Sequence, residues 1–184
     1  ALSLSPGPDN IFVLTQSALY GRAAGLLVTL GLCTGLLVHT AAVSLGVAAI
    51  FQTSALAFNL LKLVGAAYLL YLGVQAFRAD SATLNNVGDD KPKHQKLYSR
   101  GIIMNITNPK VAIFFLAFLP QFADPSNGPV SAQMMILGGL FIVTTLCVFG
   151  GIAWFSGYLR EWLQHSEKAQ VIMNRIAGTV FTGL

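Results

Sequence analysis

The sequence has 184 residues, of which 54% are hydrophobic and only 10% are charged. A soluble domain carries about 25% charged residues, so this chain has too few charges to cover a soluble exterior. With a mean hydropathy of +0.66, the composition predicts an integral membrane protein. The net charge of +4 does not indicate nucleic-acid binding, because the basic residues lie between apolar runs, where membrane topology places them.

Apolar runs follow one another along the chain, and most are long enough to cross a bilayer as helices. They cover about residues 1–20, 23–51, 56–77, 101–123 and 132–159, and a sixth begins near 171. The sequence shows no alternation of the barrel kind, so it predicts an all-α membrane bundle of six transmembrane helices. The runs at the two chain ends are short, and we therefore expect the sequence to be trimmed inside its first and last helices.

Basic residues follow the first, third and fifth runs, whereas the loops after the second and fourth runs hold none. This alternation assigns the basic loops to the cytoplasm and both termini to the periplasmic side. A cytoplasmic loop, residues 79–100, then separates two three-helix repeats, 1–78 and 101–184, within one membrane domain. Because each half has an odd number of spans, the halves are inverted relative to each other, as in many secondary transporters.

Each half opens on a proline break beside an ionisable residue. The helix breaks are Pro6, Gly7 and Pro8 in the first half and Pro109 in the second. At 1.5 Å per residue, Asp9 lies roughly 18 Å and Lys110 roughly 14 Å from the cytoplasmic edge of a hydrocarbon core about 30 Å thick. A charge near the midplane is costly and usually marks a substrate or ion pathway.

Proline breaks free backbone carbonyls, and the helix that restarts presents amide donors and the positive end of its dipole. We therefore expect a site for a zwitterion, in which Asp9 binds an ammonium group while Lys110 and the amides near Asn108 bind a carboxylate. Asn10, Asn105 and Asn108 can donate and accept hydrogen bonds in the same cavity. The alternative is that Asp9 and Lys110 pair with each other and hold the bundle together. The two interpretations are compatible if substrate binding opens the pair.

Other polar residues lie inside or beside the apolar runs. His39, in the outer half of the second run, is a candidate proton relay or a hydrogen-bonding partner of a neighbouring helix. Gln121 is a candidate for the outer mouth of the site or for a helix cap. Cys33 and Cys147 are interpreted as small buried hydrophobes.

Two further patterns concern packing and chemistry. The spacings Gly21-x-x-x-Gly25 and Gly31-x-x-x-Gly35 predict close helix packing. The sequence contains no metal-ligand cluster, no phosphate loop and no Ser/His/Asp arrangement. We therefore expect a transporter rather than an enzyme, with no cofactor and no metal site.

Several stretches of this sequence occur together in one known family. They are SPGPDN in the first run, NPK in the fourth, GAAYLLYLG at 65–73, FLPQF at 118–122 and GRxxG at 21–25. In combination they resemble the LysE/RhtB family of amino-acid exporters over nearly the whole chain. The resemblance implies a six-span bacterial inner-membrane protein without a metal site. It also implies export of amino acids or their derivatives, driven by the proton motive force through antiport.

With one candidate intramembrane acid, a neutral amino acid such as homoserine, threonine or leucine is favoured over lysine. The expected partners are this amino acid, protons and the lipid bilayer, and the glycine-rich second run would suit either a homodimer or an internal contact. Two other classes stay open. A cation or metal exporter of the same superfamily would need more intramembrane acids and histidines than Asp9 and His39. A membrane thiol-redox relay would need cysteines beside the proline breaks, where Asp9 and Lys110 stand instead.

Overall fold

The computed structural model describes residues 7–53 and 93–156, together with single residues between 56 and 74. Within these residues every regular element is a helix and no strand occurs, which confirms the predicted all-α class. The predicted break at Pro6, most of the predicted third helix and the whole of the sixth lie outside the described residues. The six-helix inverted repeat therefore stays a prediction.

In the first half, α1 (Pro8–Tyr20) and α2 (Arg22–Thr53) are joined by one residue, Gly21. Its φ of +89° is a backbone conformation that favours glycine, and its amide donates to Ser17 O over 2.9 Å. A Cβ at Gly21 would meet nothing within 4 Å. The predicted packing role of Gly21 is therefore wrong. Glycine is needed here for the backbone conformation of the tight turn, and not for close contact with another helix.

In the second half the chain forms a bent span followed by a straight one. The elements are α4 (His94–Thr107), α5 (Pro109–Ile113), the π-helix η2 (Phe114–Phe118), the short helices η3 (Leu119–Phe122) and η4 (Pro125–Asn127), and α6 (Val130–Trp154). The axis bends by 52° between α4 and the residues after Pro109. The break predicted at this proline is therefore present.

The start of α4 differs from the sequence expectation, because this helix begins at His94 and not at Gly101. Leu97 is buried in an apolar cluster against α1, α2 and α6, and this packing extends the helix into a polar stretch that hydropathy assigned to the loop. The π-helix was also not predicted. Pro120 lies two residues after its end, and a proline ring clashes with the carbonyl four residues earlier, which a wider turn can relieve.

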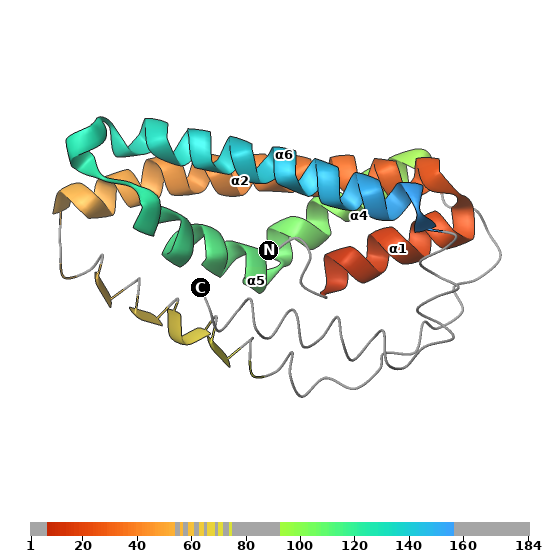
Figure 1. Ribbon diagram of the computed structural model, residues 1–184, viewed down its shortest axis with the longest axis horizontal. Helices are drawn as coiled ribbons and strands as arrows, with labels where there is room; N and C mark the ends of the chain where they lie inside the picture. The colour runs from red at the N-terminus through yellow and green to blue at the C-terminus, as the bar shows by residue number, and fades with distance from the viewer. Residues whose placement is uncertain are drawn as a thin grey trace.

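Among the described residues, two helices are long and apolar enough to cross a membrane, in the segments Arg22–Gly46 and Val130–Trp154, and the bent pair makes a third if counted as one span. In Figure 1, α2 and α6 run side by side along the long axis of the molecule. The starts of α1 and α5 lie near the middle of that axis, and the two helices run from there toward opposite ends. The starts of both helices therefore meet halfway along the bundle, as the counted depths of Asp9 and Lys110 predicted.

Buried apolar side chains form two clusters, one on each side of this meeting point. The α1-side cluster consists of Val13, Ala24, Val28, Leu32, Leu97, Phe149 and Ala153. The α5-side cluster consists of Leu36, Val43, Val111, Phe114, Phe115, Leu119 and Met134. Helices in lipid gain little from apolar burial itself, so van der Waals contacts within these clusters are the main source of their cohesion.

Glycines bring helix α2 close to its neighbours. A Cβ on Gly31 would collide with the backbone of α4 at Tyr98 and Gly101, and one on Gly25 would lie 2.9 Å from Ala153 Cβ in α6. A Cβ on Gly35 would lie 2.7 Å from the side chain of Asn105. The close packing predicted for these three glycines is confirmed.

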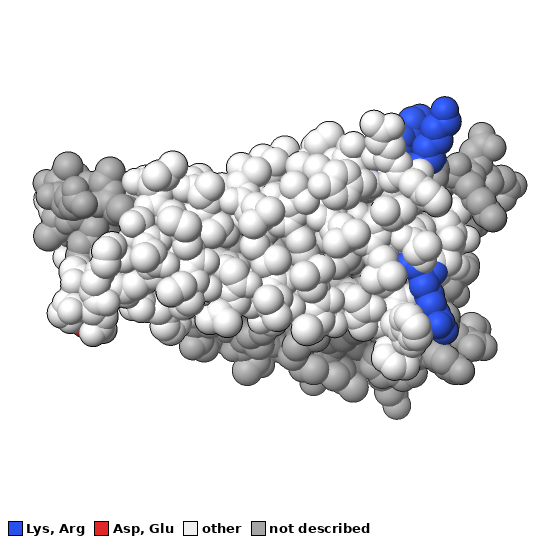
Figure 2. All heavy atoms as spheres, turned by 90° about the horizontal axis from the view of Figure 1, so that it is seen from above, with Lys and Arg blue, Asp and Glu red and all other residues white. Residues whose placement is uncertain are grey.

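Described charges are concentrated at the ends of the bundle. Figure 2 shows that Lys and Arg on the face seen from above lie near one end, and that the middle of this face is uncharged. This basic end contains the α1–α2 turn with Arg22 and the start of α4 at Lys93. Asp124 lies at the opposite end, before η4. Asp9 and Lys110 are the charged residues that the described helices hold between these ends.

Candidate functional site

The first turn of α1 places Asp9 inside the bundle. Gly7 is the N-cap in an extended conformation and Pro8 occupies the first helical position, where its missing N–H costs nothing. Asp9 follows within the first turn, where the positive end of the helix dipole stabilises a carboxylate. Its side chain is only 7% exposed, so it must find polar partners within the protein.

Two asparagines from the bent span supply those partners. Asn108 Nδ2 donates to Asp9 Oδ1 over 3.0 Å, and Asn105 Nδ2 donates to Asp9 Oδ2 over 3.5 Å. Asn108 is also the N-cap of α5, because its Oδ1 accepts a hydrogen bond from the Lys110 amide over 3.0 Å. One side chain thus fixes the start of α5 and holds Asp9 in place.

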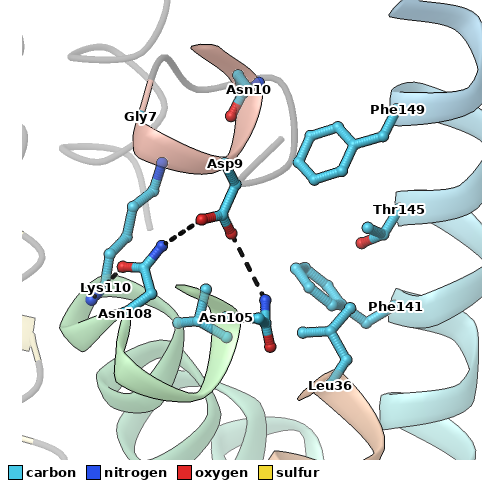
Figure 3. A pocket seen from close by; sticks show the side chains of 11 residues that line it. Gly7, Asp9, Asn10, Leu36, Asn105, Asn108, Lys110, Phe141, Thr145 and Phe149 are labelled. Carbon is cyan, nitrogen blue, oxygen red and sulfur yellow. Dashed lines mark hydrogen bonds between the residues drawn. The ribbon is translucent and has the colours of Figure 1, made fainter. Parts of the chain in front are cut away.

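Lys110 faces the same space from the opposite half of the chain. Figure 3 shows its side chain extending from the start of α5 toward the first turn of α1, near Gly7. Its positive charge interacts with the carboxylate of Asp9. The structure therefore brings together the two charged residues that the sequence singled out.

These residues line one pocket between the two apolar clusters (Figure 3). The described lining residues are Gly7, Asp9, Asn10, Leu36, Asn105, Asn108, Lys110, Val111, Phe141, Thr145 and Phe149. The centre of a water molecule can occupy about 20 Å³ of it, which is room for about one water.

The wall opposite Asp9 comes mainly from α6, which was not predicted to contribute to the site. Phe141, Thr145 and Phe149 are spaced four residues apart and therefore share one face of α6. Most of α6 is exposed and equally apolar on its other sides. Hydropathy could not reveal which face turns inward. The available signal was Thr145, a hydroxyl near the middle of an apolar span.

The side-chain oxygen of Asn105 is buried without a hydrogen-bond donor among the described residues. The residue is 2% exposed. Gly35 makes room for this side chain, since an added Cβ would lie 2.7 Å from Oδ1. Figure 3 shows Oδ1 turned away from Asp9. A buried acceptor without a donor is costly, and this oxygen lies against Gly35 and not toward Asp9.

Two other predicted residues lie outside the pocket lining. His39 is half-buried, and its Nε2 lies 3.1 Å from the backbone oxygen of Asn105, which matches the expected bond to a neighbouring helix. Gln121 is exposed, and its side-chain amide donates to Ala117 O one turn earlier, over 2.9 Å. Its position therefore favours the helix-end interpretation over the mouth of the site.

Gln16 is a buried polar residue that was not predicted from the sequence. This residue of α1 is buried, and its Oε1 has no hydrogen-bond partner among the described residues. It lies seven residues after Asp9, two turns along a similar face of the helix. The signal was a glutamine within an apolar run.

Both cysteines lie outside the pocket lining, and only one has the predicted environment. Cys33 is buried, but Cys147 is exposed on α6. Its predicted burial is therefore wrong, because an apolar run does not distinguish a side chain that faces lipid from one that faces protein. In the part of the chain that the structure describes, His, Cys, Asp and Glu do not form a group of three that could hold a metal ion.

Comparison with known proteins gives one family. The family model described as LysE type translocator matches residues 1–184. A protein of Salmonella typhimurium named homoserine/homoserine lactone efflux protein is 37% identical over 180 residues, covering 98% of this chain and 86% of the relative. A Bacillus subtilis protein named uncharacterized membrane protein YrhP is 30% identical, covering 97% of this chain and 88% of the relative. No solved structure matches.

Proposed function

This chain belongs to the LysE type translocator family, and on that premise we propose that it exports a neutral amino acid or a close derivative across the bacterial inner membrane by proton antiport. The observation that carries the proposal is the buried carboxylate of Asp9. It is held by Asn108 and Asn105 and faces Lys110 in a pocket halfway along the bundle. A charge at this depth is energetically costly, and such residues usually mark a substrate or ion pathway.

The pocket has the chemistry of a zwitterion site. Asp9 would accept hydrogen bonds from the ammonium group of the substrate. The carboxylate of the substrate would bind at Lys110 and at the start of α1. The N-cap of α1 is Gly7, which supplies no capping side chain. The start of α5 suits a carboxylate less well than the sequence suggested, because Asn108 already caps the Lys110 amide.

The remaining walls favour a small neutral side chain. Leu36, Val111, Phe141 and Phe149 are apolar, and Thr145 adds one hydroxyl. The described lining offers no second acid to pair with a cationic side chain. The Salmonella relative is named for efflux of homoserine and homoserine lactone, and homoserine matches this pocket because it has a short side chain with one hydroxyl.

Export requires access to the site from one side at a time. The α1-side and α5-side clusters lie on opposite sides of the pocket, and each would form a barrier to water and solute. We place the basic end of the bundle in the cytoplasm by the positive-inside rule. The α1-side cluster would then open to load substrate, and the α5-side cluster would open to release it. Asp9 would carry the returning proton when the ammonium group has left.

Membrane vesicles preloaded with labelled amino acids test this function. The assay compares efflux of homoserine, threonine, leucine and lysine, with and without a proton gradient, from vesicles containing the protein, Asp9→Asn or Asp124→Asn. Asp124 is the control acid: it is exposed at the bundle end, and hydrogen bonds from Ser126 lower its pKa, so it is ionised at neutral pH.

We expect gradient-dependent efflux of homoserine that Asp9→Asn abolishes and Asp124→Asn preserves. Undiminished efflux by Asp9→Asn would contradict the proposed role of this carboxylate. Efflux of metal ions, or thiol exchange, with no transport of any amino acid would favour the two alternative classes instead.

A further inference from the structure

Pro109 leaves one carbonyl at the helix bend without its usual donor. In an uninterrupted α-helix the carbonyl of Asn105 would accept from the amide four residues later, but that residue is Pro109, which has no N–H. The oxygen instead accepts from the Asn108 amide over 3.1 Å and contacts His39 Nε2 at 3.1 Å. Because a carbonyl only accepts, His39 must carry a proton on Nε2 in this bond.

His39 contacts both arms of the bent span. Its ring nitrogen bonds to Asn105 at the end of α4, and its ring lies 5.7 Å, centroid to centroid, from that of Phe115 in η2, beyond the bend. The ring itself comes from α2, the long straight helix. A single side chain on α2 thus connects the part of the span before the break with the part after it.

The same bond acts on the site through Asn105. The backbone oxygen of this residue accepts from His39, while its side-chain amide donates to Asp9. Asn108, three residues later at the bend, donates to the other carboxylate oxygen. The angle at the bend therefore decides whether both amides can reach Asp9 at once.

We propose that His39 is a positioning residue that clamps the α4–α5 bend and so keeps Asn105 and Asn108 on Asp9, and that it does not carry the transported proton. Its Nε2–H must remain in place to serve as a donor, whereas a relay would release that proton in every cycle. This inference rests on the proposed export function for its transport measurement, but its structural measurement is independent of transport.

Two variants separate a clamp from a relay. His39→Gln keeps a donor at about the reach of Nε2 but cannot exchange a proton near neutral pH. His39→Leu keeps bulk and removes the donor. In a Cys33→Ala, Cys147→Ala background, spin labels at Ile103 in α4 and Phe122 in η3 report the bend angle as a distance, since both positions are 60% exposed.

For a clamp, we expect His39→Leu to shift or broaden the distance distribution between the labels and to lower homoserine export on the order of tenfold, the factor that about 1.4 kcal/mol corresponds to. His39→Gln should restore both quantities to within about threefold. Export abolished by both variants with an unchanged distance distribution would overturn the proposal in favour of a relay. Unchanged distances and unchanged export in His39→Leu would also overturn it.

If the parent protein exports none of the tested amino acids, the proposed function fails, while the label distances still decide whether His39 holds the bend. If His39→Leu does not insert, nitrogen-15 NMR of the histidine-labelled parent protein decides. A His39 ring fixed with its proton on Nε2 supports the clamp, and one that carries it on Nδ1 contradicts it.

Discussion

The side chains of Asn108 and Asp9, 99 positions apart in the chain, meet in a hydrogen bond of 3.0 Å between Nδ2 and Oδ1. Asn108 makes this bond while its own Oδ1 caps the Lys110 amide. The side-chain oxygen of Asn108 therefore caps α5, and its side-chain nitrogen joins the two halves of the protein. Substitutions at this position can separate these two roles.

Asn108→Asp should lower export more than Asn108→Ser. Both replacements retain an oxygen that can cap α5, and aspartate is at least as good an N-cap as asparagine. Aspartate, however, would turn a second negative charge toward Asp9, where two carboxylates at close range cannot both stay ionised. Export from preloaded vesicles, normalised to the amount of inserted protein, measures the difference. Export by Asn108→Asp at the level of the parent protein would show that the bond to Asp9 is dispensable.

Gly35→Ala should destabilise the protein by about 1–3 kcal/mol, the usual cost of overpacking. The new Cβ would lie 2.7 Å from the Asn105 side chain and would push that residue away from Asp9. Gly46→Ala on the same helix is the matched control, because nothing lies within 4 Å of its added Cβ. Thermal unfolding in detergent should rank Gly35→Ala below the parent protein and Gly46→Ala level with it or above it.

Cysteines placed at positions 9 and 110 should be joined by short crosslinkers in a background lacking Cys33 and Cys147. Asp9 and Lys110 line the same pocket, so the expected product is an intramolecular crosslink detected after cleavage of the 79–100 stretch. A cysteine at Lys96 paired with one at position 9 serves as the control, since Lys96 lies in the first turn of α4 at the basic end. Failure of the 9–110 pair with every short linker would count against a shared site.

Thr145→Val should reduce homoserine export several-fold while leaving leucine export within about twofold, because it removes a hydroxyl and keeps the side-chain shape. Thr145 is buried and lines the pocket, whereas its neighbour Thr144 is exposed and donates to Leu140 O over 2.8 Å. Thr144→Val should leave both rates unchanged. A parallel loss of homoserine and leucine export in Thr145→Val would point to packing, and not to recognition of the substrate hydroxyl.

The meeting of Asp9 with Lys110 could be predicted from the sequence because an α-helix has a fixed rise. Counting residues from the ends of two apolar runs was enough to put both charges at one depth. The prolines beside them marked the breaks, since proline both removes a donor and interrupts the helix. These inferences need only local rules and the thickness of a bilayer.

The α6 wall of the pocket could not be predicted in this way. In a soluble helix, polar residues mark the side away from the core, but Leu140, Val143 and Phe141 are equally apolar while only the last faces the pocket. The bond from His39 to Asn105 was equally hidden, because it depends on the register between α2 and α4. That register is set where Gly31 meets Gly101. The glycine spacing predicts that Gly31 packs closely against another helix, but it does not predict which helix or residue that is.

Because a single residue, Gly21, connects α1 to α2, a rotation of α1 about this residue would displace the far end of the helix the most. Gly21 holds one end of the helix against α2, and Asp9 lies at the other end, roughly 18 Å away at 1.5 Å per residue. With Gly21 as the fulcrum, a tilt of about 10° moves the carboxylate by about 3 Å, which is enough to break hydrogen bonds of 3.0 Å and 3.5 Å. A small rotation of α1 about Gly21 would therefore be enough to release Asp9 from both asparagines.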